Sequence, residues 1–132
     1  MKIKTSELTG AALDWAVAKC EGALHPLGNV VIEGKSLWLA VDGEAHTYME
    51  EDVEYTPSTD WSQGGPIIER EHITPMFDGS EWCAGVSEQV SCGGDPAFST
   101  RLYDGPTPLI AAMRCYVASE LGDEVDVPEG LA

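Results

Sequence analysis

The chain is organised around one segment, Tyr55-Thr-Pro-Ser-Thr-Asp-Trp-Ser-Gln-Gly-Gly-Pro-Ile-Ile-Glu-Arg70. This segment concentrates helix-capping residues, two adjacent glycines and a proline within one short window. Asp60 suits the N-cap of a helix, and Gln63 follows at the spacing of a capping box. Pro66 has no backbone N–H, so we expect the helix either to kink at Pro66 or to restart there. The segment therefore predicts a loop that leads into a helix.

One face of this predicted helix has no side chains in its middle. At helical spacing the face consists of Trp61, Gly64, Gly65, Ile68 and His72. Two glycines that face the body of the protein allow its backbone to approach closely, either to a sheet or to a ligand. The sequence leaves both interpretations open.

A ligand at this helix start would meet several suitable groups. Free N–H groups at a helix N-terminus hold phosphate or carboxylate, and an indole ring can stack on a base. The candidate ligand-binding residues are Ser58, Thr59, Asp60, Trp61, Gly64, Gly65 and Arg70. A positive charge to help an anion would have to come from Arg70, Arg101 or Arg114. In the alternative interpretation Asp60 is only a cap, Trp61 belongs to the core, and the glycines let the helix press on a sheet.

The composition indicates a folded and strongly acidic protein. The chain has 132 residues, 43% of them hydrophobic, and a formal net charge of −16. This length predicts a single domain over residues 1–132. The charge repels phosphates and anionic lipids, which argues against direct binding of nucleic acids or membranes. The same charge would allow the protein to imitate a nucleic acid and occupy a basic groove on another protein.

No pattern for targeting, redox chemistry or metal binding stands out. The N-terminus lacks the apolar core of a signal peptide, and no window approaches the roughly 18 apolar residues of a membrane span, so we expect a cytoplasmic protein. Glu69 and His72 form a single E-x-x-H motif without the further ligands of a carboxylate-bridged metal site, and no cofactor is expected. Free thiols are expected for Cys20, Cys83, Cys92 and Cys115, although the middle two would also be able to meet across a hairpin.

Two further helices have clear boundaries. The first is expected over residues 9–21, with Thr9 as its N-cap and Gly22 just past its end. Its apolar stripe faces the core, while Asp14 is expected to point elsewhere. The last helix begins after Thr107 as N-cap, with proline at its first position, and ends at Gly122.

The remaining segments indicate strands and loops. Residues 30–55 contain β-branched and alternating residues, which predict two or three antiparallel strands, and the acidic run 50–54 is expected at a strand end or in an interaction patch. Residues 76–90 predict a hairpin that turns at Asp78-Gly79. Residues 91–100 are typical of a loop, and residues 128–132 are expected to fray.

These elements predict an α+β fold. We expect an antiparallel sheet of about four or five strands with three helices packed on it. Since three amphipathic helices accompany a single sheet, a three-layer α-β-α sandwich is the variant to consider.

Three stretches carry a resemblance to a known family. They are Met1-Lys-Ile-Lys-Thr-Ser-Glu-Leu-Thr-Gly-Ala-Ala-Leu-Asp-Trp-Ala-Val-Ala-Lys-Cys20, Ser58-Thr-Asp-Trp-Ser-Gln-Gly-Gly-Pro-Ile-Ile-Glu-Arg70 and Thr107-Pro-Leu-Ile-Ala-Ala-Met-Arg-Cys-Tyr116. Together they resemble the NinX-like proteins of tailed bacteriophages, which are small accessory proteins of unknown function. The second and third stretches also resemble, more weakly, the phage α-β-α sandwich domains. The resemblance implies a phage gene product in the cytoplasm of an infected bacterium, and it carries no catalytic or binding residues.

Two functions from different classes follow as hypotheses. In the first, the protein is a non-enzymatic module that binds a small, nucleotide-like molecule at the helix start and so counters host defence. In the second, it is an acidic decoy that binds a host protein. Without a nucleophile motif we expect no enzymatic activity. A homodimer is a further expectation, since a small sheet with an uncovered edge invites pairing.

Overall fold

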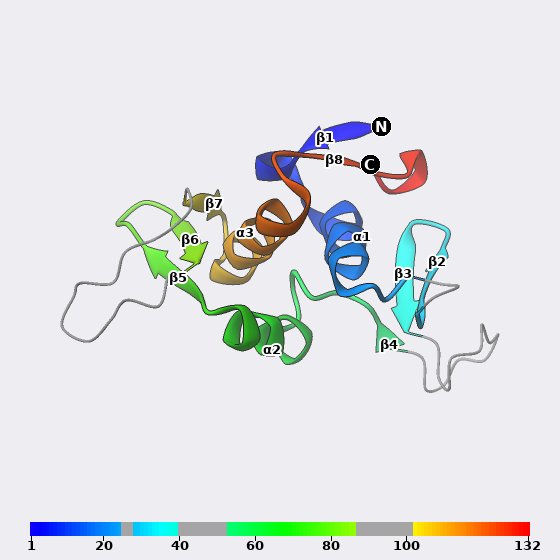
Figure 1. Cartoon of the computed structure of the whole chain (residues 1–132), viewed down its shortest axis with the longest axis horizontal. Coiled ribbons are helices and arrows are strands. Elements are labelled where there is room, and N and C mark those ends of the chain that lie inside the picture. Colours follow the sequence, from blue (N-terminus) through cyan, green and yellow to red (C-terminus); the bar gives the residue numbers. More distant parts are fainter. Residues whose placement is uncertain (25–27, 40–52, 87–101) are drawn as a thin grey trace.

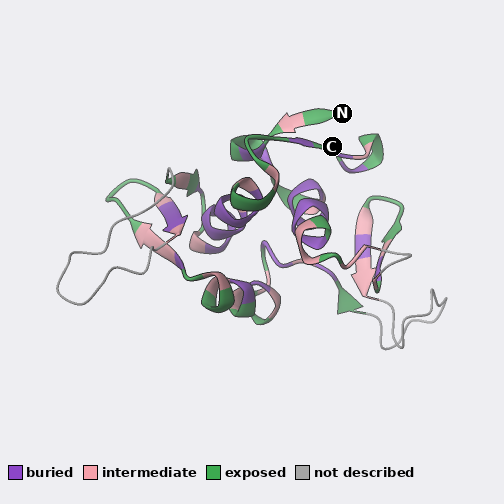
Figure 2. Ribbon diagram, viewed as in Figure 1, coloured by how far each residue is buried: buried purple, intermediate pink, exposed green. Residues whose placement is uncertain are grey.

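Two helices, α1 (Gly10–Glu21) and α3 (Pro108–Leu121), lie side by side at the centre of the protein (Figure 1). The structure is a computed structural model that describes residues 1–24, 28–39, 53–86 and 102–132. Seven consecutive residues of α1, 12–18, are buried, and α3 is buried over residues 109–113 and 115–117. A helix that is apolar on all sides belongs inside the protein. The purple ribbons of Figure 2 show these two helices as the core.

The predicted helix boundaries are confirmed for both. Thr9 is the N-cap residue of α1, although its hydroxyl makes no capping bond, and Gly22 closes the helix in the left-handed conformation with φ 66°. In α3 the Thr107 hydroxyl accepts a hydrogen bond from Ile110 N at 3.1 Å, and Pro108 is the first helical residue. Local sequence signals therefore set these helix boundaries.

The middle helix, α2 (Trp61–Glu71), lies at the surface and packs on α3 through one side. Gly64 and Ile67 are its buried residues. The helix runs through Pro66 without a restart, and it ends at His72, which is left-handed with φ 56°. Figure 2 shows exposed and buried stretches alternating along α2, as expected for an amphipathic surface helix.

In the described part of the chain, three small antiparallel sheets surround the helices (Figure 1). The first joins the two ends of the chain through β1 (Lys2–Lys4) and β8 (Glu124–Asp126). The second contains β2 (Val30–Glu33), β3 (Ser36–Leu39) and β4 (Val53–Glu54), and its β3 contacts α1. The third contains β5 (Ile73–Phe77), β6 (Trp82–Val86) and β7 (Tyr103–Gly105), and all three strands contact α3.

The α+β class is confirmed, but the prediction of one sheet of four or five strands was wrong, and so was its three-layer variant. The buried helices α1 and α3 occupy the centre, so the strands that would have formed one sheet lie on different sides of them (Figure 1). The described strands are two to five residues long, too short to reach around the helices. Buried side chains of the helices and all three sheets nevertheless form one hydrophobic cluster.

Several smaller predictions can be compared with the described residues. The β5–β6 hairpin turns at Asp78-Gly79 as predicted. Its expected extension over residues 87–90, the loop at 91–100 and residues 40–52 of the predicted strand region 30–55 lie outside the described residues. β4 includes the end of the acidic run. The last residues differ from the expected frayed end, because residues 129–131 form a 3-10 helix, η3 (Glu129–Leu131), and Leu131 is buried.

Candidate functional site

The start of α2 shows how Asp60 and Gln63 hold the preceding loop. Asp60 Oδ1 accepts hydrogen bonds from Ser62 N at 2.9 Å and from Ser62 Oγ at 2.7 Å, which confirms its capping role. These bonds lower the pKa of Asp60 below its usual value. Gln63 does not reach back to the Asp60 N–H as a standard capping box would. Instead its side chain accepts from Thr56 N at 2.9 Å and donates to Glu54 O at 2.8 Å, so Gln63 binds the loop to the helix.

Gly64 lies where α2 packs tightly against Pro57 in the preceding loop and Leu109 in α3. A Cβ atom on Gly64 would lie 2.4 Å from the Pro57 carbonyl oxygen and 2.6 Å from Leu109 Cδ1. A Cβ on Gly65 would meet only Trp61 Cε3, at 3.9 Å. Gly64 therefore lets α2 approach α3 closely, and the indole of Trp61 lies beside Gly65 at the surface with 52% of Trp61 exposed. Of the two interpretations of the glycines, this geometry matches close packing, against a helix and a loop rather than a sheet.

Arg70 is engaged by carboxylates of its own chain. Its guanidinium donates to Glu21 Oε1 at 3.0 Å and to Glu21 Oε2 at 2.6 Å, and its Nε donates to Glu71 at 2.7 Å. The ring of Tyr116 lies beneath it, 5.8 Å from ring centroid to Arg70 Cζ. Arg70 thus joins α2 to α1 and α3, about one helix length from the Asp60 cap, and its charge is already compensated.

Of the two predicted site residues Ser58 and Thr59, Ser58 contacts Asp14 on α1. Ser58 is buried, its N–H donates to Asp14 Oδ1 at 2.9 Å, and its own Oγ has no hydrogen-bond partner. Thr59 is exposed. Asp14, which was expected to point away from the core, is 4% exposed in the middle of α1. This expectation failed because α1 is buried all round, so no position of its central turns faces water.

A hollow of about 190 Å³ opens beside Asp14. It lies between the start of α1, β3 with the end of β4, and the loop that precedes α2. The residues that line it include Asp14, Glu54, Tyr55, Thr56 and Thr59. One predicted site residue, Thr59, therefore lines a hollow, and Asp14 and Tyr55 are site residues that the sequence did not single out.

Asp14, in the wall of this hollow, has an unusually high pKa for an aspartate. Burial raises the pKa of Asp14 from 3.8 to about 6, against the hydrogen bonds from Ser58 that lower it, and the nearby Glu54 carboxylate raises it further. Burial and neighbouring carboxylates also raise the pKa of Tyr55, which keeps its proton. An aspartate within a helix of otherwise apolar buried residues was the sequence signal that identifies such a position.

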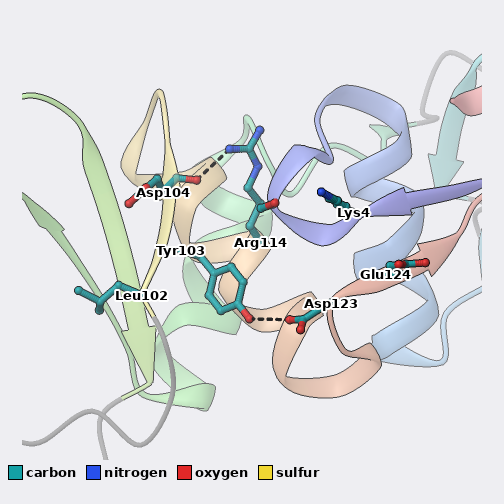
Figure 3. Close-up of a pocket in the computed structure, with 8 residues that line it drawn as sticks. Lys4, Leu102, Tyr103, Asp104, Arg114, Asp123 and Glu124 are labelled. Carbon is teal, nitrogen blue, oxygen red and sulfur yellow. Dashed lines mark hydrogen bonds between the residues drawn. The ribbon is translucent and has the colours of Figure 1, made fainter.

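A second, larger hollow of about 450 Å³ lies near β7 and α3 (Figure 3). Arg114 borders it and donates to two backbone carbonyls, Leu8 O and Asp104 O, each at 2.8 Å. The Tyr103 hydroxyl donates to Asp123 Oδ1 at 3.3 Å, below Arg114 in the view of Figure 3. The charged lining consists of Lys4, Arg114, Asp104, Asp123 and Glu124. With two cations and three carboxylates, this hollow does not offer an anion a net positive environment. Arg101, the third arginine considered as a partner for an anion, lies outside the described residues.

The described cysteines are free thiols: Cys83 and Cys115 are buried, and Cys20 is half-buried. Burial raises the pKa of Cys115 to about 11 and that of Cys20 to about 12, so both stay protonated at neutral pH and are poor nucleophiles. Cys92, and with it the possible pairing to Cys83, lies outside the described residues. Over these same described ranges, no three His, Cys, Asp or Glu side chains group as metal ligands.

None of the helices in the described part of the chain is long and apolar enough to cross a bilayer.

Comparison with known proteins identifies a family. Residues 4–120 match the family model described as Bacteriophage P22, NinX. The match covers α1, α2 and all but the last residue of α3, and it agrees with the resemblance noted in the sequence. A search of curated proteins found no match.

Proposed function

Because the chain belongs to the bacteriophage P22 NinX family, we propose that it is a non-enzymatic phage accessory protein that acts inside the infected bacterial cell. Its acidic surface binds a host protein that normally holds nucleic acid, and this binding counters a host activity directed at the phage. The observation that carries the proposal is the formal net charge of −16 on a folded body with a common hydrophobic core.

The described surface supports a role as a nucleic-acid mimic. Exposed carboxylates occur on α2, α3, the strands and the turns, at Glu7, Glu33, Glu54, Glu69, Asp78, Glu81, Asp104, Glu120, Asp123, Glu124, Asp126 and Glu129. Glu81 shows how closely some of them stand, because the charges of Asp104 and Asp78 raise its pKa. Such a field attracts a basic groove from a distance and accelerates association with it.

The small-molecule version of the function, in which a nucleotide-like ligand binds at the start of α2, has less support than the acidic decoy. That version required open space beside the two glycines, and Pro57 and Leu109 occupy the space beside Gly64. It also required a cation near the helix start, while Arg70 is bound to Glu21 and Glu71. A nucleotide-like ligand remains the second candidate only through the hollow at Thr59, which lies next to the predicted residues.

The test is a capture experiment with host extract. The tagged protein should retain a host protein at about 0.05 M salt and release it at about 0.5 M, because screening at the higher salt weakens exposed charge pairs. Heparin or double-stranded DNA should displace the captured protein, since both would occupy the same basic groove. The matched variant carries Glu54→Gln, Glu69→Gln, Glu81→Gln and Glu124→Gln, four exposed positions that keep their side-chain shape.

Three outcomes separate the hypotheses. Loss of capture by the four-residue variant, with unchanged thermal unfolding, supports the decoy. A captured protein that neither heparin nor DNA displaces argues against mimicry. Release of a nucleotide by heating the protein after incubation with extract, detected by mass spectrometry, would favour the small-molecule version. Light scattering of the purified 14.1 kDa chain reports in the same experiment whether it forms the expected homodimer.

A further inference from the structure

We propose that the hollow between α1, β3 and the loop before α2 receives the cationic side chain, arginine or lysine, of the protein partner. This inference rests on the proposed function, because it names the place where a basic partner inserts a residue. It is carried by the hollow itself, by a buried carboxylate in its wall and by the charge of the surrounding protein.

The wall carboxylate is Asp14, which has no cationic partner among the described residues. It is 4% exposed, and its Oδ1 accepts a hydrogen bond from Ser58 N at 2.9 Å. Removing a carboxylate from water without a counterion is unfavourable, and the cost is recovered when a cation reaches it. An arginine or lysine that enters the hollow would supply that counterion.

The rest of the lining suits a guanidinium or ammonium group. Glu54 lines the hollow from the end of β4, with an exposed position that a partner can approach. Thr56 and Thr59 also line it, and a threonine hydroxyl can accept a hydrogen bond. No lysine or arginine of the described chain lines this hollow.

An anion is the competing occupant. Gly10 and Ala11 line the same hollow, and the N–H groups that begin α1 have no side-chain cap from Thr9. A helix N-terminus favours negative charge. Here two carboxylates, Asp14 and Glu54, and the net charge of −16 oppose an anion, so the cation is the occupant that the charges favour.

The experiment is an NMR titration of the ¹⁵N-labelled full chain. The probes are N-acetyl-arginine amide and N-acetyl-lysine amide, with N-acetyl-citrulline amide as the neutral analogue of arginine and acetate as the anion. The Ser58 N–H is the reporter, because it donates directly to Asp14. We expect saturable shifts of the Ser58 and Thr59 amides with the two cations, and none with citrulline or acetate.

The decisive variant is Asp14→Asn. Its amide oxygen can still accept from Ser58 N, so it removes the charge and keeps the contact. Affinity for the arginine probe should fall about tenfold or more in Asp14→Asn, and severalfold in Glu54→Gln. Glu33→Gln, an exposed carboxylate at the end of β2, is the control and should bind as the parent chain does.

Several results would overturn the inference. Equal binding of arginine by the parent chain and both hollow variants would place the cation elsewhere, and saturable shifts with acetate would show an anion site. If Asp14→Asn does not fold, Glu54→Gln decides alone. A host protein captured equally well by Asp14→Asn and the parent chain would refute the insertion but leave the acidic-decoy function standing. Conversely, if no host protein is captured, the probe titration still measures whether the hollow binds a cation.

Discussion

Arg70 on α2 and Glu21 on α1 form a two-pronged ion pair, with Nη1 to Oε1 at 3.0 Å and Nη2 to Oε2 at 2.6 Å. The Tyr116 hydroxyl on α3 donates to the same Glu21 Oε2. One carboxylate therefore joins all three helices, and Arg70 and Tyr116 together lower its pKa even though burial raises it. Parallel hydrogen bonds of this kind fix both distance and orientation, which a single charge contact does not.

Replacing Arg70 by alanine should destabilise the protein. The ion pair is partly exposed, since half of the Arg70 side chain is accessible, so we expect a loss of about 1 kcal/mol in the free energy of unfolding. This corresponds to a melting temperature lower by about 3 to 5 °C. Arg70→Lys should recover only part of the loss, because an ammonium group cannot make two parallel bonds.

Thermal and urea unfolding measure this effect. Lys35→Ala, in the exposed turn between β2 and β3, is the control and should leave the midpoint unchanged. A melting temperature for Arg70→Ala equal to that of the parent chain would mean that water replaces the ion pair without cost.

The two adjacent glycines of α2 should respond differently to alanine. Gly64→Ala brings a methyl group 2.4 Å from a backbone oxygen that cannot turn away, so we expect a loss of about 1–3 kcal/mol in unfolding free energy. Gly65→Ala meets no atom beyond its chain neighbours closer than Trp61 Cε3 at 3.9 Å. Because Gly65 directly precedes Pro66, whose ring disfavours helical backbone at a preceding residue that has a Cβ, we expect no gain and a change within about 0.5 kcal/mol. Urea unfolding of the pair compares them directly, and equal stabilities would contradict the packing described around Gly64.

These helix details show what the sequence can predict. Asp60, Thr107 and Gly22 act on backbone groups within a few residues of themselves, so their roles are readable from the local order of residues. The Asp78-Gly79 turn is local in the same sense. For such features the interacting backbone group lies within the same short stretch of sequence that predicts the feature.

The remainder depends on contacts between distant residues. Lys2 pairs with Asp126 across almost the whole chain, and this pairing, like the division into three sheets, has no local pattern. Asp14 looked like a polar residue on the outer side of a helix, and only the packing of α1 buries it. Gln63 has capping-box spacing, yet its side chain binds the loop at Thr56 and Glu54. The candidate hollow combines elements from three parts of the sequence, so no single segment predicts it.

Trp61 should matter for binding more than for folding. Because 52% of Trp61 is exposed, Trp61→Ala should change the unfolding free energy by less than about 1 kcal/mol. Large aromatic side chains dominate many protein interfaces, so the same variant should weaken capture of the host protein about tenfold. Phe77→Ala, at an exposed aromatic position on the β5–β6 hairpin, is the control and should keep the affinity. Unchanged affinity in Trp61→Ala would remove the start of α2 from the interface.

Asp14 should give the protein a characteristic pH dependence of stability. Its pKa is about 6 in the folded chain against 3.8 in a free side chain. Between these two values the folded state binds more protons than the unfolded state, so the free energy of unfolding should fall as pH rises through this window. The full difference at neutral pH is on the order of 3 kcal/mol, reduced by any relaxation that lets water reach the carboxylate.

Asp14→Asn should abolish this dependence. At pH 7.5 the variant should be at least as stable as the parent chain, and the two should converge as the pH falls through 3.8, because Asp14 then becomes protonated in the unfolded state as well as in the folded state. Asp60→Asn is the matched control of opposite sign: hydrogen bonds lower the pKa of Asp60, so its contribution is present above 3.8 and is lost as pH falls. Urea unfolding of the three proteins from about pH 2.5 to pH 8 covers both titration windows and gives two difference curves, each the parent chain minus one variant. If the Asp14 curve is flat or rises with pH, then its carboxylate is not held away from water, and the hollow has no uncompensated charge to offer an arginine.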